Sequence, residues 1–233
     1  MERNVQGLEV LNGGSAYGLV DSQRVLRNTY WLLALSMVPT VLGAWIGVQT
    51  GIVSHMTPGM STILFLVGAY GLMFGINATK NSPTGVFMLL GFTFFMGLMM
   101  SRLLGLVLGG YSNGASIVMT AFGGTAGVFF GMATLATVVK RDLSGLTRFL
   151  MIGAIIAIVA SLINFFVQST AAMLAISTAV MVIFSVFVMV DIRRVIDGGE
   201  TNYVMATLNI YLDLYNVFQS LLVLLTSLTG DRR

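Results

Sequence analysis

Two carboxylates at the margins of long apolar stretches are the side chains best able to do chemistry in this sequence. Asp191 follows twenty residues that carry no charge, and Asp213 lies inside the apolar run 208–229, about five residues or ~8 Å past its start. A charge at such a position is costly in hydrocarbon and is rarely kept without a use. On consecutive antiparallel helices, both carboxylates lie toward the same side, where they can share a site.

Two carboxylates that share a site cannot both ionise cheaply, so the pair holds one proton near neutral pH and titrates as a unit. Once ionised, the oxygens of Asp191 and Asp213 form a hard site of the kind that suits Ca²⁺. The alternative is structural, with each aspartate bonded to a near neighbour. These neighbours are Arg193 and Arg194 for Asp191, and Asn209 and Asn216 for Asp213.

The other polar side chains within or beside apolar runs are better explained by structural roles. Arg102 lies eighteen residues past Thr84, or ~27 Å along a helix, which favours a position where its guanidinium reaches the outer headgroups. Asn164 is a candidate for a polar contact between helices. Asp142 is expected to cap a helix or stay at the surface. His55 is expected in a solvated loop, because no second histidine and no cysteine is present to complete a zinc site.

The sequence carries no motif of the common enzyme classes. HExxH, a Walker motif and the dinucleotide-binding GxGxxG are absent. An intramembrane aspartyl protease typically has a glycine beside an aspartate, whereas both aspartates here lie between aliphatic residues. We therefore expect no catalytic activity and no cofactor, with Ca²⁺ considered only as a bound or transported ion.

The composition identifies the chain as an integral membrane protein. Of its 233 residues, 56% are hydrophobic and only 9% are charged, against about 25% charged in globular domains. The formal net charge of +3 is too small and too dispersed for a nucleic-acid-binding face. The absence of cysteine excludes disulfides and thiolate chemistry.

Seven apolar runs predict an all-α protein with seven transmembrane helices, because about 20 apolar residues span a bilayer. The runs are continuous rather than alternating, which excludes a β-barrel. We expect one transmembrane domain at 29–229, a flexible cytoplasmic tail at 1–28 and a short tail at 230–233. The apolar runs are 29–50, 60–79, 84–108, 115–139, 148–168, 171–190 and 208–229.

Glycines four residues apart recur along several of these runs. Examples are Gly43 with Gly47, and the stripe Gly123, Gly127 and Gly131. Such spacing lets helix backbones approach closely in a bilayer, where burial of apolar surface gives no drive for association. We therefore interpret the stripes as packing surfaces rather than as hinges or a thin-walled path.

The last third of the chain resembles the signature of the Bax inhibitor-1 family. The matching residues are Asp191, Tyr203, Ala206, Tyr211-Leu212-Asp213, Asn216, Phe218 and Leu221-Leu222, with Lys140-Arg141-Asp142-Leu143-Ser144 and Asn164-Phe165 upstream. The resemblance implies six helices around a central last helix, and a pH-gated calcium leak whose two sensor carboxylates match Asp191 and Asp213. In this family a basic residue at the inner end of the second span latches to the sixth-helix aspartate, and Lys80 lies at that position.

Two further segments resemble a proteobacterial branch of that family, the YccA-type proteins. They are Val25-Leu26-Arg27-Asn28-Thr29-Tyr30 and Gly198-Gly199-Glu200-Thr201-Asn202-Tyr203. Proteins of this branch are inner-membrane proteins that bind and modulate FtsH, a membrane-bound AAA protease. The resemblance implies an alternative function, in which the chain is a regulatory partner and slow substrate of FtsH without transport activity. A tail containing Arg24 and Arg27 would then engage the protease.

Positive charges alternate between the loops, and this makes the topology testable. The tail 1–28 and the second, fourth and sixth loops carry lysine or arginine, whereas the first, third and fifth carry none. The positive-inside rule then puts the N-terminus in the bacterial cytoplasm and the C-terminus outside. A reporter enzyme that works only outside the cytoplasm should therefore be active when it is fused after Arg233. A cytoplasmic signal would contradict the seven-span topology and favour a re-entrant last segment.

Overall fold

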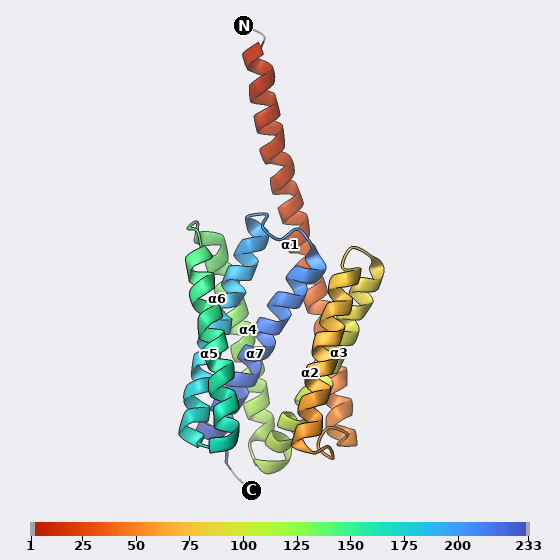
Figure 1. Ribbon diagram of the computed structural model, residues 1–233, viewed down its shortest axis with the longest axis vertical. Helices are drawn as coiled ribbons and strands as arrows, with labels where there is room; N and C mark the ends of the chain where they lie inside the picture. The colour runs from red at the N-terminus through yellow and green to blue at the C-terminus, as the bar shows by residue number, and fades with distance from the viewer. Residues whose placement is uncertain (1–2, 232–233) are drawn as a thin grey trace.

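The computed structural model describes the backbone of residues 3–231 and the side chains of residues 22–231, and it consists of seven helices (Figure 1). No strand occurs within the described backbone, and every helix contains a stretch long and apolar enough to cross a membrane. The predicted all-α membrane fold is therefore confirmed. The helices are α1 (Arg3–Thr50), α2 (Pro58–Thr79), α3 (Pro83–Gly110), α4 (Gly114–Val138), α5 (Ser144–Val167), α6 (Thr170–Ile196) and α7 (Tyr203–Thr229).

Local signals begin and end these helices. A proline occupies the first turn of both α2 and α3, where its missing N–H costs no helical hydrogen bond. Asn202 caps α7, because its side-chain oxygen accepts from the backbone N–H groups of Val204 and Met205. At the end of α5, Gln168 adopts the left-handed conformation with φ 56°, which stops the helix.

Helices α6 and α7 extend farther than their apolar runs. Helix α6 continues to Ile196 rather than ending near residue 190, and α7 begins at Tyr203 rather than at residue 208. Hydropathy falls where a helix leaves the hydrocarbon, but its backbone hydrogen bonds continue into water. As a result, Asp213 lies nearly three turns into α7, ~15 Å from the start of the helix rather than ~8 Å.

The polar segment 1–28, predicted to be a flexible tail, is helical where the structure describes it. Helix α1 begins at Arg3, and its apolar span occupies Ser22–Thr50. The segment before the span projects beyond the bundle (Figure 1). Adding a turn to an existing helix is much easier than nucleating one, and this explains why a polar sequence joined to a transmembrane helix stays helical.

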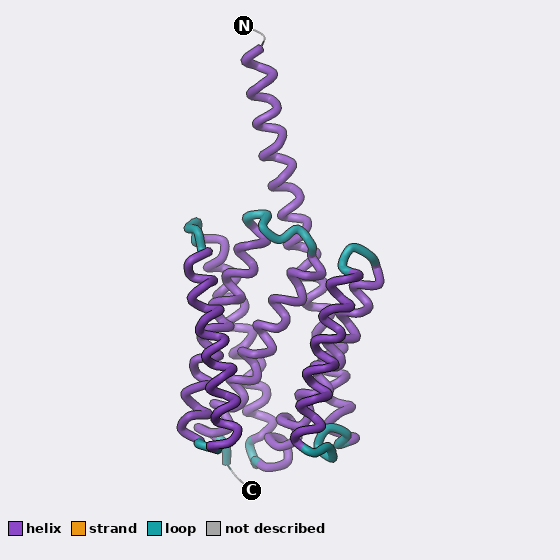
Figure 2. Tube along the Cα trace, viewed as in Figure 1, coloured by secondary structure: helices purple, strands orange, loops and turns teal. Residues whose placement is uncertain are grey.

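The loops lie at the two ends of a bundle of antiparallel helices (Figure 2). The N-terminal extension and the loops 80–82, 139–143 and 197–202 lie at one end, which we call the basic end because these loops carry Lys80, Lys140 and Arg141. The C-terminus and the remaining loops lie at the opposite end (Figure 1). The two termini are thus on opposite sides, as an odd number of spans requires.

Helix α7 is the central element, as the family resemblance implies. It packs against α1, α2, α3, α4 and α6, and it buries polar as well as apolar side chains. Helix α5 is the exception in the surrounding ring, because within the described chain it packs on α6 alone. The most extensive pairings join α1 to α3 and α6 to α7.

The glycine pattern explains the close pairing of α1 with α3. A methyl group on Gly43 would collide with the carbonyl oxygen of Phe94, and one on Gly97 would collide with that of Thr40. The packing interpretation is wrong for Gly127 and its neighbours in the α4 stripe, because no atom lies within 4 Å of the methyl position there. That stripe faces outward, since the adjacent helices cover other sides of α4.

We predict that Gly97→Ala loosens the α1–α3 pair and lowers the free energy of unfolding by about 1–3 kcal/mol, the usual cost of overpacking. Gly127→Ala is the matched control, because it adds the same methyl group within a helix where space is open. Thermal unfolding of both purified variants measures the difference. Equal stability of the two variants would show that the seam tolerates the added volume.

Candidate functional site

Asp213 is the most unusual polar residue of the transmembrane core. Only 6% of its surface is exposed, and no hydrogen bond reaches its Oδ2 from any residue that the structure describes. It lies on the central helix between Leu212 and Leu214, one turn from the buried Val217. A buried carboxylate oxygen without a protein donor is costly, and a proton on the group or a bound cation would relieve that cost.

The packing of α6 on α7 brings Asp191 near this carboxyl group. Asp191 is partly buried between Val190 and Ile192, and its charge acts electrostatically on Asp213. Two more charged groups act on Asp191, namely Arg194 and Glu200 at the basic end. The two aspartates thus form an electrostatically coupled pair in the half of the bundle toward the basic end.

Two of the structural partners considered for the aspartates, Arg193 and Asn216, are engaged elsewhere, whereas Arg194 acts on Asp191 electrostatically. Arg193 forms an ion pair with Asp197 at 2.6 Å and donates from Nη1 to the carbonyl oxygen of Ala136. The Asn216 amide donates to the carbonyl oxygen of Leu212 at 2.8 Å. Asn209 is half-buried one turn before Asp213, and among the described residues no hydrogen bond joins the two.

Lys80 does not latch to Asp191 in this structure. Its Nζ donates to the Asn77 side chain at 3.1 Å, and the ion pair found in the described part of the chain joins other residues. The carbonyl oxygen of Lys80 has a different partner, the amide nitrogen of Asn202, at 3.0 Å. The latch implied by the family resemblance is therefore absent here as a side-chain contact.

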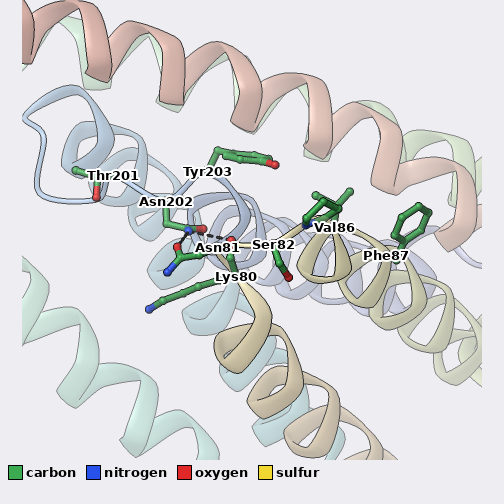
Figure 3. A pocket seen from close by; sticks show the side chains of 9 residues that line it. Lys80, Asn81, Ser82, Val86, Phe87, Thr201, Asn202 and Tyr203 are labelled. Carbon is green, nitrogen blue, oxygen red and sulfur yellow. Dashed lines mark hydrogen bonds between the residues drawn. The ribbon is translucent and has the colours of Figure 1, made fainter.

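Asn202 joins the α2–α3 loop to the start of the central helix, a role that the sequence analysis missed. Its Nδ2 donates to the carbonyl oxygen of Lys80 and to Oδ1 of Asn81 at 2.9 Å, while its Oδ1 caps α7 (Figure 3). Its own backbone N–H donates to Glu200. The position of Asn202 just before the start of α7 was a signal for the cap. The bridge had no such signal, because its partners Lys80 and Asn81 lie 122 and 121 residues away in sequence.

A cleft of about 550 Å³ with mixed polar and apolar walls lies beside this bridge (Figure 3). Side chains from the α2–α3 loop and the start of α7 line it, with the exposed Phe87 at its apolar side. The cleft lies at the basic end, away from the buried Oδ2 of Asp213.

The remaining predicted residues have local roles. Arg102 donates to the Ser61 hydroxyl at 3.2 Å, near the end of α2 opposite the basic end, so it is far from the aspartate pair as expected. Asn164 accepts from the backbone N–H of Ser169 and thus orders the α5–α6 turn. His55 is exposed in its loop. Arg24 and Arg27 are both exposed on α1.

Asp142 acts as a structural group before α5. Hydrogen bonds from the backbone N–H and the hydroxyl of Ser144 lower the pKa of this exposed carboxylate. The arrangement stabilises the first turn of α5, where a negative charge interacts favourably with the helix dipole. The expected surface or capping role is confirmed.

The coupled pair offers two carboxylates to a cation. Across the described residues, no group of three or more metal-binding side chains comes together. A hard cation such as Ca²⁺ takes six to eight oxygens, so backbone carbonyls and water would supply the rest.

The chain is similar to known bacterial membrane proteins along nearly its whole length. Residues 22–230 match the family model described as Inhibitor of apoptosis-promoting Bax1. The Modulator of FtsH protease YccA of Escherichia coli (strain K12) is 37% identical over 213 residues, which cover 91% of this chain and 94% of the relative. The Inner membrane protein YccA of Escherichia coli O6:H1 has the same identity and coverage. A membrane protein of Vibrio cholerae is 37% identical over 209 residues, or 88% of this chain and 90% of the relative.

We predict that Asn202→Ala lowers the free energy of unfolding by about 1–2 kcal/mol, because the helix cap and the loop bridge are both lost. Asn202→Asp is the matched variant: it keeps the oxygen that caps α7 and removes only the amide donor. Hydrogen exchange should show Val204 and Met205 still protected in Asn202→Asp and unprotected in Asn202→Ala. Identical exchange in both variants would contradict the assignment of two separate roles.

Proposed function

The chain belongs to the Bax1-I family, inhibitors of apoptosis-promoting Bax1, and from that premise we propose that it is a pH-sensitive cation leak of the bacterial inner membrane. The observation that carries the proposal is the buried Oδ2 of Asp213, which has no hydrogen-bond donor among the described residues and is coupled to the charge of Asp191. Such an oxygen can hold a proton in one state and contact a cation in another.

We propose that the aspartate pair shares one proton in the closed state. Loss of that proton leaves two like charges facing each other across α6 and α7. At an effective dielectric constant of 20, two unit charges about 4 Å apart repel by about 4 kcal/mol, and the repulsion falls in inverse proportion to their separation. Conformational states of proteins commonly differ by a few kcal/mol, so this repulsion is large enough to change which state is populated.

The proposed opening separates α6 from α7 toward the basic end, where a cation can reach the ionised carboxylates. We propose that this end faces the cytoplasm, because the positive charges of the loops gather there. The Asn202 bridge lies at the same end and ties the α2–α3 loop to α7, so it favours the closed arrangement. The protein then acts as a gated pathway rather than as an enzyme, and Ca²⁺ is its transported ion rather than a resident cofactor.

Calcium flux into liposomes should therefore rise with pH in the wild-type protein. Below the titration range the shared proton is present and the pathway is closed; above it the proton is lost and the pathway opens. Asp213→Asn should give a flux that no longer varies with pH, because an amide neither titrates nor adds charge. Asp191→Asn should likewise keep the flux low and nearly independent of pH, because no second charge remains to repel an ionised Asp213. A calcium-sensitive dye inside the liposomes measures all three.

Asp197→Asn is the matched control for these variants. Asp197 lies just after α6, is exposed, and pairs with Arg193 rather than with the aspartate pair. Its flux should follow the wild-type curve. If the wild type, Asp191→Asn and Asp213→Asn gave superimposed curves while all remained folded, the pair would have no role in gating.

A second candidate function is regulation of a membrane protease. A relative 37% identical to this chain is named Modulator of FtsH protease YccA, and this favours a role as a partner and slow substrate of FtsH. Helix α1 supplies a segment that such an enzyme can grip, because it projects from the basic end (Figure 1). Arg24 and Arg27 are exposed farther along the same helix. An isolated polar helix is marginally stable, so an unfolding enzyme can unwind it readily.

Deleting residues 1–20 should lengthen the lifetime of the protein severalfold in cells that contain FtsH and leave membrane insertion intact. Pulse-chase measurement of the full-length and shortened chains gives the two lifetimes. The same pair in cells depleted of FtsH is the control, and there the difference should disappear. An unchanged lifetime in FtsH-containing cells would remove α1 as the point of engagement.

A further inference from the structure

A long apolar groove opens on the side of the bundle between α1 and α4. The backbones of these two helices stay apart within the described chain, and α3 and α7 form the floor between them. The groove has a volume of about 740 Å³ and is lined along α1 from Tyr30 to Gln49. This stretch of α1 is ~28 Å long, close to the ~30 Å thickness of the hydrocarbon core of a bilayer.

The hydroxyl groups at the floor of the groove are already hydrogen-bonded within the protein. The Tyr211 and Thr40 hydroxyls lie 3.0 Å apart, and the Tyr215 hydroxyl donates to the carbonyl oxygen of Met96 at 3.5 Å. The other lining side chains are overwhelmingly apolar, including Phe122 and Met119 on α4. An occupant of this groove therefore has to be apolar, because it finds few free polar partners.

The size of the groove suits an acyl chain. A chain of 16 to 18 carbons occupies roughly 500 Å³, if each methylene group is about as large as the ~30 Å³ of a water molecule. The groove therefore has room for a lipid chain along the stretch of α1 that lines it.

Charge distinguishes the two ends of the groove. At the basic end, Arg27 precedes the lining residue Tyr30 by one turn on α1, and Lys140 follows the end of α4, ten residues beyond the lining residue Phe130. Both are exposed, and the ion pair present within the described chain involves neither. At the opposite end, Asp231 accepts a hydrogen bond from Ser112 beside the start of α4. An anionic headgroup is therefore favoured at the basic end and disfavoured at the other.

We propose that this groove binds one anionic phospholipid, with an acyl chain between α1 and α4 and its phosphate near Arg27 and Lys140. The Tyr30 and Phe129 rings meet edge to face across the groove, with centroids 5.8 Å apart, and they join the two walls near the basic end. The acyl chain consequently enters from the bilayer side, below this ring pair. The lipid site is independent of the proposed ion leak, because no residue of the aspartate pair lines the groove.

Photolabelling tests the acyl chain. The full-length protein is reconstituted in vesicles that contain phosphatidylglycerol carrying a diazirine on one acyl chain, and labelled peptides are identified by mass spectrometry. We expect labels on groove residues such as Met37, Met100 and Met119. Labels spread evenly over the outward faces of α5 and α6 would overturn the proposal, and this measurement on the wild type needs no variant to fold.

Filling the groove should displace the lipid. Ala34→Trp and Ala126→Trp each place a large ring in the groove from one wall, whereas Ala179→Trp adds the same ring to an exposed position on α6. Groove labelling should fall about tenfold in the first two, the loss expected when roughly two buried methylene groups lose their contacts. It should be unchanged in the third. Unchanged labelling in folded, monodisperse Ala34→Trp and Ala126→Trp would overturn the site.

Competition tests the headgroup. Unlabelled phosphatidylglycerol should displace the photolipid at least about fivefold more effectively than phosphatidylcholine, and Arg27→Gln with Lys140→Gln should remove this preference. Arg148→Gln is the control, because Arg148 is exposed at the same end but on α5. Equal competition by both lipids in the wild type would overturn the anionic assignment. Cross-links to a second copy of the chain instead of to lipid would replace the lipid with a dimer contact.

Discussion

The arrangement of the bundle depends on one buried carboxyl group. This is Asp213, which lies on the helix that the others surround and whose Oδ2 has no hydrogen-bond donor among the described residues. Because α7 is buried on several sides, the Oδ2 of Asp213 is shielded from water, and it finds no partner in the described chain. Helix α6 supplies Asp191, whose charge acts on this group. Because hydrocarbon cannot solvate a charge, the protonation of this group and the packing of α6 against α7 are energetically linked.

The rest of the bundle divides into close and loose contacts around that helix. Glycines hold α1 against α3, and a collision with carbonyl oxygens would follow if Gly43 or Gly97 gained a side chain. Asn202 ties the α2–α3 loop to the first turn of α7. Between α1 and α4 the backbones stay apart in the described chain and only side chains such as Tyr30 and Phe129 meet, so the space that remains is the lipid-sized groove. A bundle built in this way can keep one side rigid while α6 and α7 separate.

The sequence predicted the seven spans and both aspartates, because apolar runs of this length cross a bilayer and a charge beside or within them is rarely kept without a use. It misplaced the end of α6 and the start of α7, since helical hydrogen bonding continues past the hydrocarbon. The bridge made by Asn202 was not predictable, because it joins residues about 120 positions apart. The four-residue spacing of the glycines also could not show that Gly43 packs against a neighbouring helix while Gly127 faces outward.

The central claim is that the buried pair holds a proton at neutral pH. Infrared difference spectroscopy of the protein in lipid, comparing the wild type with Asp213→Asn, measures this directly. We predict a band of a protonated carboxyl group in the wild type at neutral pH that is absent from the variant and is replaced by carboxylate bands as the pH rises. A spectrum with only carboxylate bands for this pair at neutral pH would contradict the account.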